Sequence, residues 1–359
     1  MYKRIGFLVG VLIALQACVN PLTVRPQYTP RAPSHPIELV DAMPSPDGTL
    51  ILFEYRDMRL SANWRGMGLL NWRTNEMTRI PPPPGQQFMQ ASFSDNGQQL
   101  AVGIGVRGSL SPREIGVLNL QTMQFTPVTH QQINGLPEFP IFQPGTNNIV
   151  YIHDDFMRKR LVHLDRLNNQ VHPLMNEKIG GFLTLERPSF VARNELVFTA
   201  RAPKNIKLKQ RTEAITSDTN NVIAYRLRFG SPPQVLSPQD EANKAYKGFG
   251  EGAFTDLSSS RNGKIMTFYR VSPARPYNEQ GKIISELYIR QNGQDIQLTN
   301  QESRVLNTAI SYDGSTIAFL ADFDVPRQAN LYIYDMNTGQ VTATHLLGRI
   351  LTNPSFSGR

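Results

Sequence analysis

The stretch Pro44–Phe53, which reads PSPDGTLILF, joins a tight-turn signal to a β-strand pattern. Asp47-Gly48 supplies the glycine that a turn with positive φ favours, and the apolar run that follows favours an extended strand. Similar stretches begin at intervals of 49, 49, 48, 67 and 53 residues, at Phe93, Phe142, Phe190, Leu257 and Ile310. A period of about 40 to 50 residues with strand-like content is typical of a β-propeller blade.

Each repeat also contains a second hairpin pattern. In the first repeat it reads MGLLNWRTNEMTRI from Met67, and in the last it reads NLYIYDMNTGQVTAT from Asn330. Two hairpins give four antiparallel strands per repeat. Six repeats therefore predict an all-β fold over residues 37–359, a six-bladed β-propeller with four strands per blade.

The SPDG and SYDG turns, each followed by an IAF-like strand, resemble the repeat of TolB-type propellers. The resemblance is most specific in Pro44–Phe53, Phe93–Val102 and Ile310–Leu320, and it implies the propeller fold for nearly all of residues 40–359. TolB itself also carries an amino-terminal α/β domain that we do not find in this sequence. We therefore carry over the fold and not the partner.

The carboxy-terminal stretch NPSFSGR, residues 353–359, looks like the opening of another repeat. A ring has to close, and a strand paired beside the first blade would remove exposed edges. We predict that the tail is this closing strand. The alternative, a truncated seventh blade, would leave an open edge.

The amino terminus has the three-part layout of an export signal. Lys3 and Arg4 form a positive head, Ile5–Leu15 carry no charge, and the small residue Ala17 precedes Cys18, the single cysteine of the chain. The apolar stretch would rise about 17 Å as a helix, which is short of the roughly 30 Å hydrocarbon core. A transmembrane helix is therefore the poorer interpretation.

The motif LQAC at 15–18 resembles the lipobox of bacterial lipoproteins, although Gln16 departs from the residue usual in that family. The resemblance implies a signal peptide over residues 1–17 and a lipid on Cys18. Because Val19 follows, rather than aspartate, it also implies the outer membrane, with the protein facing the periplasm. The alternative is an ordinary secretory signal with an incidental cysteine.

Residues 18–36 are predicted to be a tether. Prolines at this density favour an extended polyproline-like chain, and they are Pro21, Pro26, Pro30, Pro33 and Pro36.

The sequence lacks the common signatures of catalysis and of nucleotide binding. It has no Gly-x-Ser-x-Gly elbow and no Gly-rich loop that opens a helix, and we predict no cofactor. Some propeller lyases that resemble this protein in fold bind a divalent ion through histidines in the central funnel. Here the histidines follow strand spacing, so we predict no metal site for His130, His153, His163 and His172.

The positive charge is predicted to lie on one face. The net charge is +8, and the loops between second and third strands share one face of a propeller. Residues 56–65, 103–113, 153–160, 200–221, 270–284 and 322–330 together hold 17 Lys and Arg against 8 Asp and Glu. An anionic partner would be drawn to such a face. The candidate binding residues are Arg56, Arg59, Trp64, Arg65, Arg107, Arg113, Arg158, Lys159, Arg160, Lys204, Lys207, Lys209, Arg211, Arg270 and Arg275.

These features predict a non-enzymatic envelope lipoprotein. Its propeller would bind a protein or another anionic envelope component in the periplasm, and the predicted export argues against nucleic acid. The rival hypothesis is an enzyme with a site in the propeller funnel, such as a metal-dependent lyase or hydrolase acting on an anionic glycan.

Overall fold

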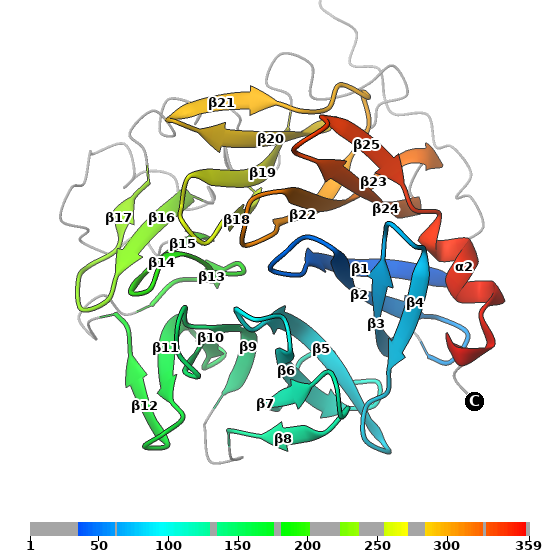
Figure 1. The fold of residues 1–359 in the computed structure, drawn as a ribbon. Helices are drawn as coiled ribbons and strands as arrows, with labels where there is room; N and C mark the ends of the chain where they lie inside the picture. Colours follow the sequence, from blue (N-terminus) through cyan, green and yellow to red (C-terminus); the bar gives the residue numbers. More distant parts are fainter. Residues whose placement is uncertain are drawn as a thin grey trace, which may run out of the picture.

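The computed structural model describes residues 35–61, 63–129, 135–175, 181–201, 223–236, 255–271, 284–325 and 328–356. Within these ranges, six antiparallel sheets surround a central axis (Figure 1). The predicted six-bladed, all-β propeller with four strands per blade is confirmed.

The strands follow the chain blade by blade. Blade 1 contains β1 (Ile37–Pro44), β2 (Leu50–Asp57), β3 (Arg65–Asn71) and β4 (Glu76–Ile80). Blade 2 contains β5 (Gln86–Phe93), β6 (Gln99–Val106), β7 (Glu114–Asn119) and β8 (Phe125–Pro127). Blade 3 contains β9 (Leu136–Phe142), β10 (Ile149–Asp154), β11 (Lys159–Asp165) and β12 (Gln170–Pro173).

The second half of the ring repeats this plan with one irregularity. Blade 4 contains β13 (Thr184–Leu185) and β14 (Ser189–Ala192), which together form its interrupted inner strand, and β15 (Glu195–Arg201), β16 (Ile223–Arg228) and β17 (Gln234–Val235). Blade 5 contains β18 (Thr255–Ser259), β19 (Ile265–Val271), β20 (Ser285–Gln291) and β21 (Gln294–Gln297). Blade 6 contains β22 (Val305–Ile310), β23 (Thr316–Val325), β24 (Gln328–Asp335) and β25 (Gln340–Ala343).

The strand register defines two faces of the ring. The first strand of each blade lies nearest the axis (Figure 1), and its start pairs with the end of the second strand, as Ile37 does with Asp57 and Gln86 with Val106. The start of each inner strand and the loop between second and third strands therefore share one face, which we call the loop face. The turns between first and second strands lie on the opposite face, which we call the turn face.

A recurring hydrogen-bonded turn explains the sequence repeat. In blade 1, the Ser45 hydroxyl donates to Asp47 Oδ1 at 2.5 Å and accepts from the Leu50 backbone N–H at 2.9 Å, while Gly48 has φ 69°. A serine, an Asn or Asp two residues later and a glycine make the same pattern in three other blades, at Ser94–Gly97, Ser260–Gly263 and Ser311–Gly314. In each turn the serine hydroxyl thus accepts a hydrogen bond from a backbone N–H group of the turn.

The carboxy-terminal tail differs from the prediction. The predicted closing strand covered residues 353–359, of which the structure describes 353–356; Pro354–Phe356 form a 3₁₀ turn, η4, and the helix α2 (Leu346–Thr352) precedes it. The predicted strand is therefore wrong for the described residues, and no strand of a seventh blade is found among them. Blades 1 and 6 each already have four strands from their own repeat. The ring closes instead through side chains, because Leu346, Leu347, Ile350 and Phe356 pack into the apolar cluster that blades 1 and 6 share.

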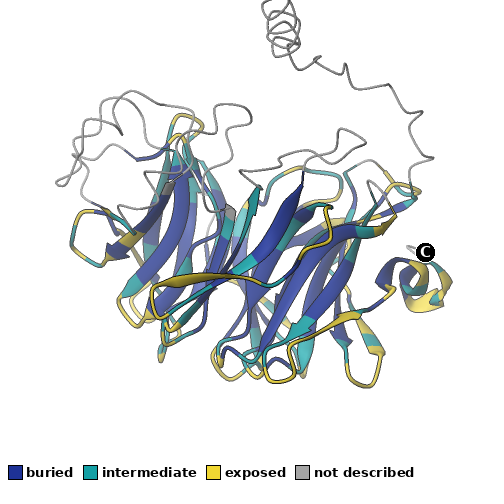
Figure 2. Ribbon diagram, turned by 90° about the horizontal axis from the view of Figure 1, so that it is seen from above, coloured by how far each residue is buried: buried dark blue, intermediate teal, exposed yellow. Residues whose placement is uncertain are grey.

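The buried and exposed residues are distributed in the same way in each blade. The central parts of the strands are buried and the turns at both faces are exposed (Figure 2). In the part of the chain that is described, no helix has the length and apolar character that a membrane crossing needs.

Candidate functional site

Most of the predicted basic residues that can be placed are held in ion pairs. Arg56 pairs with Glu38 at 2.8 Å, and Arg59 pairs with Asp57 at 2.7 Å. The partners come from strands beside the loops as well as from the loops themselves. The remaining pairs are Arg65 with Glu54, Lys159 with Glu138 and Asp154, Arg160 with Asp155, and Arg270 with Asp295.

Trp64 is not a surface residue. Its side chain is only 4% exposed and its ring packs edge-on against Tyr55, with ring centroids 5.7 Å apart. The prediction that Trp64 offers an aromatic surface to a partner is therefore wrong. The short β2–β3 loop folds back onto blade 1, where the indole joins the core that also receives the carboxy-terminal helix.

Three of the predicted arginines differ from the others because they are not held in ion pairs with described residues. Arg107 and Arg113 are exposed, Arg158 is half-buried, and none of the three makes an ion pair with a described residue. Each lies in a loop that also carries an exposed apolar side chain. Leu110 is 63% exposed in the β6–β7 loop, and Met157 is 80% exposed in the β10–β11 loop.

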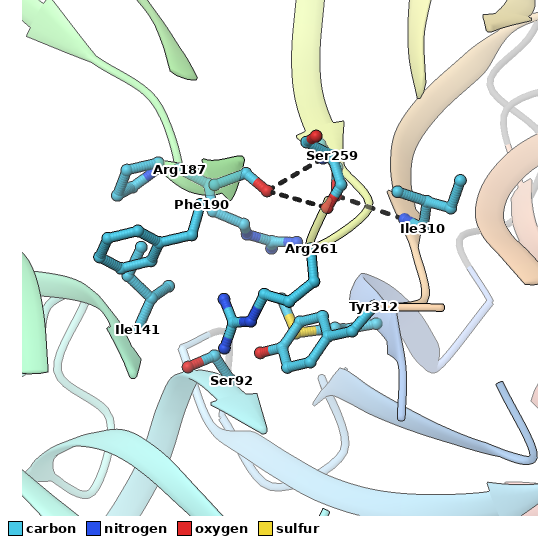
Figure 3. Close-up of a pocket in the computed structure, with 12 residues that line it drawn as sticks. Ser92, Ile141, Arg187, Phe190, Ser259, Arg261, Ile310 and Tyr312 are labelled. Atoms are coloured by element: carbon cyan, nitrogen blue, oxygen red, sulfur yellow. Dashed lines mark hydrogen bonds between the residues drawn. The ribbon is translucent and has the colours of Figure 1, made fainter. Parts of the chain in front are cut away.

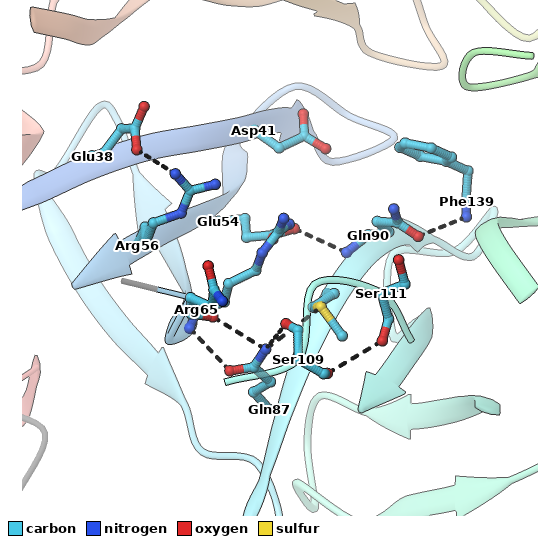
Figure 4. A network of polar contacts seen from close by, with 12 residues as sticks. Glu38, Asp41, Glu54, Arg56, Arg65, Gln87, Gln90, Ser109, Ser111 and Phe139 are labelled. Atoms are coloured by element: carbon cyan, nitrogen blue, oxygen red, sulfur yellow. Dashed lines mark hydrogen bonds and ion pairs between the residues drawn. The ribbon is translucent and has the colours of Figure 1, made fainter. Parts of the chain in front are cut away.

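A buried glutamine fixes two of these loops. Gln87 is fully buried, and its Oε1 accepts hydrogen bonds from the backbone N–H groups of Arg65 and Gly108. Its Nε2 donates to Ser109 O at 2.8 Å and approaches Asn63 O at 3.4 Å. Figure 4 shows this side chain between the β2–β3 and β6–β7 loops. One residue therefore sets the conformation of neighbouring loops on two blades.

The central channel contains a ring of one residue from each blade. In each blade, one residue of the inner strand pairs with the start of the second strand; these residues are Pro44, Phe93, Phe142, Phe190, Ser259 and Ile310. The residue of the ring lies three positions before it. The ring consists of Asp41, Gln90, Phe139, Arg187, Asp256 and Asn307. Five of these six side chains are polar, although they lie at the centre of the fold.

An ion pair crosses this ring. Arg187 lies in the break between β13 and β14, and it donates to Asp41 of β1, 146 residues away in sequence. The Asp256 carboxylate accepts from the Thr308 backbone N–H at 2.7 Å. Buried polar atoms without a hydrogen-bond partner among the described residues include Asp41 Oδ1, Arg187 Nη1 and Asn307 Oδ1. Groups of this kind usually contact ordered water, for which the channel provides the polar surroundings.

Burial raises the pKa values of two acids in and beside the channel. It raises the pKa of Asp256 to about 7, with a further rise from Asp41 and an opposing effect from Arg187. Burial also raises the pKa of the Glu54 carboxyl, which Arg65 opposes. Burial alone would lower the pKa of Arg187, but the carboxylates of Asp41 and Asp256 outweigh it and keep the guanidinium charged.

Contacts between blades cross the turn-face end of the channel. Tyr312 of blade 6 donates through its hydroxyl to Phe93 O of blade 2 at 2.6 Å. Arg261 of blade 5 stacks on the Tyr312 ring at 3.8 Å and pairs with Asp95 of blade 2. Figure 3 shows Arg261 and Tyr312 beside a small cavity. The cavity has a volume of about 20 Å³, which is room for one water molecule.

The three candidate histidines that the structure describes do not converge on the channel. His153, His163 and His172 lie on β10, β11 and β12, the second to fourth strands of blade 3. His163 Nε2 lies 3.1 Å from Gln143 Oε1, and burial lowers the pKa of its ring. Within the described ranges, no group of three or more His, Cys, Asp or Glu side chains is arranged to hold a metal ion.

Several predicted features lie outside the described residues. They are the signal peptide, Cys18 and nearly all of the tether, His130, Lys204, Lys207, Lys209, Arg211 and Arg275.

No family model and no curated protein matches the sequence. Solved structures do match. TolB from Acinetobacter baumannii is 13% identical with a TM-score of 0.54, over 86% of this chain and 64% of that one. An oligogalacturonate lyase in complex with manganese is 14% identical with a TM-score of 0.50, over 84% and 75%. An acylaminoacyl peptidase is 12% identical with a TM-score of 0.51, over 86% and 46%.

These similarities concern architecture, because propellers of this kind occur both in enzymes and in proteins such as TolB. The chain spans less than two thirds of the TolB structure that it matches. The identities are too low to transfer an activity. What the geometry and the comparisons establish together is a six-bladed β-propeller with the fold of TolB.

Proposed function

We propose that this chain is a non-enzymatic, lipid-anchored protein of the cell envelope whose propeller is a binding scaffold. The contact surface is the loop face of blades 1 to 3, and the partner is a macromolecular component of the envelope. Rigid rings that present loops at one face are a common arrangement for recognition. The TolB-like fold is consistent with such a role.

One observation carries this proposal. Arg107, Arg113 and Arg158 make no ion pair with a described residue, and they accompany exposed apolar side chains on neighbouring blades. By contrast, Arg56, Arg59 and Lys159 on the same face are each held in an ion pair. Unpaired guanidinium groups next to exposed apolar groups are typical of binding surfaces, in which arginine and large apolar residues are enriched.

The channel supports binding over catalysis. At its turn-face end Arg261 and Tyr312 make contacts between blades, and the cavity beside them has room for one water molecule. Each of Asp41, Arg187, Asp256 and Glu54 makes at least one contact with another of these side chains or with a backbone N–H group. These contacts give the residues of the channel a structural role in joining the blades.

Anchoring is tested by a single substitution. Cys18→Ser should release the protein from the membrane fraction of cells without changing its thermal unfolding. Gln16→Ala is the matched control, because it keeps the thiol and should leave the protein in the membrane fraction. Retention of the Cys18→Ser protein on the membrane would contradict the anchor.

Binding at the loop face is tested with a photocrosslinking amino acid. At Leu110, on the loop face, it should capture protein or lipid in intact cells. At Leu167, which is 91% exposed in the β11–β12 turn on the turn face, it should capture little. Equal capture at both positions, or none at either, would contradict a loop-face contact.

The rival hypothesis is a metal-dependent lyase with a glycan substrate, and the fold likeness to the lyase is the observation in its favour. In that case the purified protein should contain a stoichiometric divalent ion that is lost in a His153→Ala or His130→Ala variant. Elemental analysis of the wild-type protein and of the two variants separates the hypotheses.

A further inference from the structure

We propose that the loop face of blades 1 to 3 lies on an anionic lipid bilayer, with the apolar loop tips inserted between the headgroups and the unpaired arginines at the phosphates. The inference rests on the proposed anchoring, and it names the envelope component that the loop face contacts.

Exposed apolar side chains are concentrated on this face. Eleven large hydrophobic residues are exposed in the described part of the chain, and seven of them lie on the loop face. Five are in blades 1 to 3, namely Met58, Val106, Leu110, Phe156 and Met157, and the other two are Leu183 and Val325. The other four are Leu167, in a turn of the turn face, and Val171, Ile296 and Val341, on the outermost strands. Single exposed apolar residues are ordinary, whereas a one-sided set marks an interaction surface.

The β10–β11 loop holds its apolar tip in a fixed turn. The Asp155 backbone N–H donates to Arg158 O at 3.1 Å, and Asp155 Oδ1 accepts from the N–H groups of Met157 and Arg158 at 3.0 and 2.6 Å. Phe156 and Met157 therefore stand at the tip, 74% and 80% exposed.

Phe156 also has a φ of 67°, a conformation that a bulky L-residue adopts at a cost of about 1 kcal/mol or more. An exposed aromatic ring in a strained turn gains nothing from the fold of the isolated chain. A strained, exposed aromatic residue of this kind is better explained by contact with a second surface.

The β6–β7 loop presents a similar tip. Leu110 stands between Arg107 and Arg113, and the loop is held from below by Gln87 through Gly108 N–H and Ser109 O. In both loops an apolar residue at the tip is accompanied by an arginine without an ion-pair partner among the described residues. This order matches a bilayer surface, where an apolar side chain enters the acyl boundary and a guanidinium group stays at the level of the phosphates.

The position of the amino-terminal segment supports a bilayer as the occupant. Because Ile37 pairs with Asp57, at the start of the β2–β3 loop, the chain enters the propeller from the loop face. The residues between Cys18 and His35 could span roughly 50 Å if fully extended, so the anchor allows this face to reach the membrane that holds it. Anchoring also raises the effective concentration of lipid at the loop face, so weak contacts suffice for docking.

The test uses the full, lipidated protein in vesicles of phosphatidylglycerol and phosphatidylcholine. When Cys18 carries its predicted lipid, Met157→Cys provides one free thiol for an environment-sensitive NBD label. Leu167→Cys is the matched control, because Leu167 is at least as exposed as Met157 and lies on the opposite face of the same blade. We expect NBD emission at position 157 to rise severalfold and shift to the blue, and emission at position 167 to stay as in buffer. Vesicles of phosphatidylcholine alone should give a weaker response.

Replacing Arg107, Arg113 and Arg158 by glutamine should reduce the docked-to-undocked ratio about fivefold for each arginine. Thermal unfolding of the variant is the control for folding, since all three side chains lack ion-pair partners in the described structure.

The two parts of the proposal fail in different ways. Flotation of the same samples reports the anchor alone. Protein that floats while the label at 157 remains as in buffer, or while both labels respond alike, refutes the membrane-facing orientation and keeps the anchor. Protein that does not float refutes the anchor and, with it, the orientation. Capture of one discrete protein by a photocrosslinker at 157, with a silent label in vesicles, would assign the face to a protein and overturn the proposal.

Discussion

The carboxyl of Asp256 should make the stability of the propeller depend on pH. It lies in the central channel beside Arg187, and its pKa is raised to about 7, first by burial and then by the neighbouring Asp41 and Glu186. Asp256→Asn keeps an oxygen that can accept the Thr308 backbone N–H and removes the titration. The substitution therefore isolates one carboxyl of the channel.

The sign and the size of this pH dependence follow from the pKa of Asp256 in the folded chain and in the unfolded chain. The ordinary pKa of an aspartate is 3.8, so between about pH 4 and 7 the folded chain binds more protons than the unfolded chain. The free energy of unfolding thus falls as the pH rises through this window. About 1.4 kcal/mol per pKa unit gives at most about 4 kcal/mol. Because Asp256 is partly exposed to the channel, solvent screening reduces this effect, and we expect about 2 kcal/mol.

Thermal unfolding at pH 5 and pH 8 measures this effect. For a domain of about 300 residues, 2 kcal/mol corresponds to a shift in Tm of about 3 °C. The wild-type Tm should fall by about 3 °C more than that of Asp256→Asn between the two pH values. Asp165→Asn is the control, because the hydrogen bond from Asn168 lowers the pKa of Asp165, so its contribution is lost only at lower pH. Parallel wild-type and Asp256→Asn profiles would refute the reasoning.

Three further predictions concern stability. Phe356→Ala should lower the free energy of unfolding by about 3 to 5 kcal/mol in chemical denaturation, because the ring is fully buried against Phe53; the exposed Val341→Ala should change it by less than about 0.5 kcal/mol. Gly66→Ala should destabilise, since an added Cβ would lie 2.3 Å from the Tyr55 ring, whereas Gly348→Ala in α2 meets no atom within 4 Å and should stabilise by about 1 kcal/mol. Gln87→Leu should speed amide hydrogen exchange at Arg65 and Gly108 without affecting the turn at Asp155; unchanged exchange would show that Gln87 does not fix these loops.

The fold could be predicted because its signals are local. The turn that contains Ser45, Asp47 and Gly48 is stabilised by hydrogen bonds within five residues, and the same pattern recurs along the chain. The carboxy-terminal helix was missed although its signal is also local. Leu346, Leu347 and Ile350 lie on one face of this helix, but the prediction for this end of the chain concerned only the following stretch NPSFSGR, as a strand.

The electrostatics of the loop face could be predicted only in part, because some partners of the cations lie outside the loops. Glu54, which pairs with Arg65, is in the middle of β2, and Glu138, which pairs with Lys159, is in β9. Counting charges loop by loop includes the arginines and leaves out these acids. The pair of Arg187 and Asp41 is beyond any local argument, since 146 residues separate its members and only closure of the ring brings them together.

The two ends of the channel suggest how rigidity and binding are combined. On the turn face, Arg261, Tyr312 and Asp95 connect blades 5, 6 and 2 across the axis, so these blades cannot move apart without breaking these contacts. On the loop face, Gln87 and Asp155 hold the loops that carry Leu110 and Met157 in fixed conformations. Loops that are ordered before contact lose little conformational entropy on binding. A few apolar tips and three arginines can then suffice for docking, provided that the tether already keeps the surface close to its target.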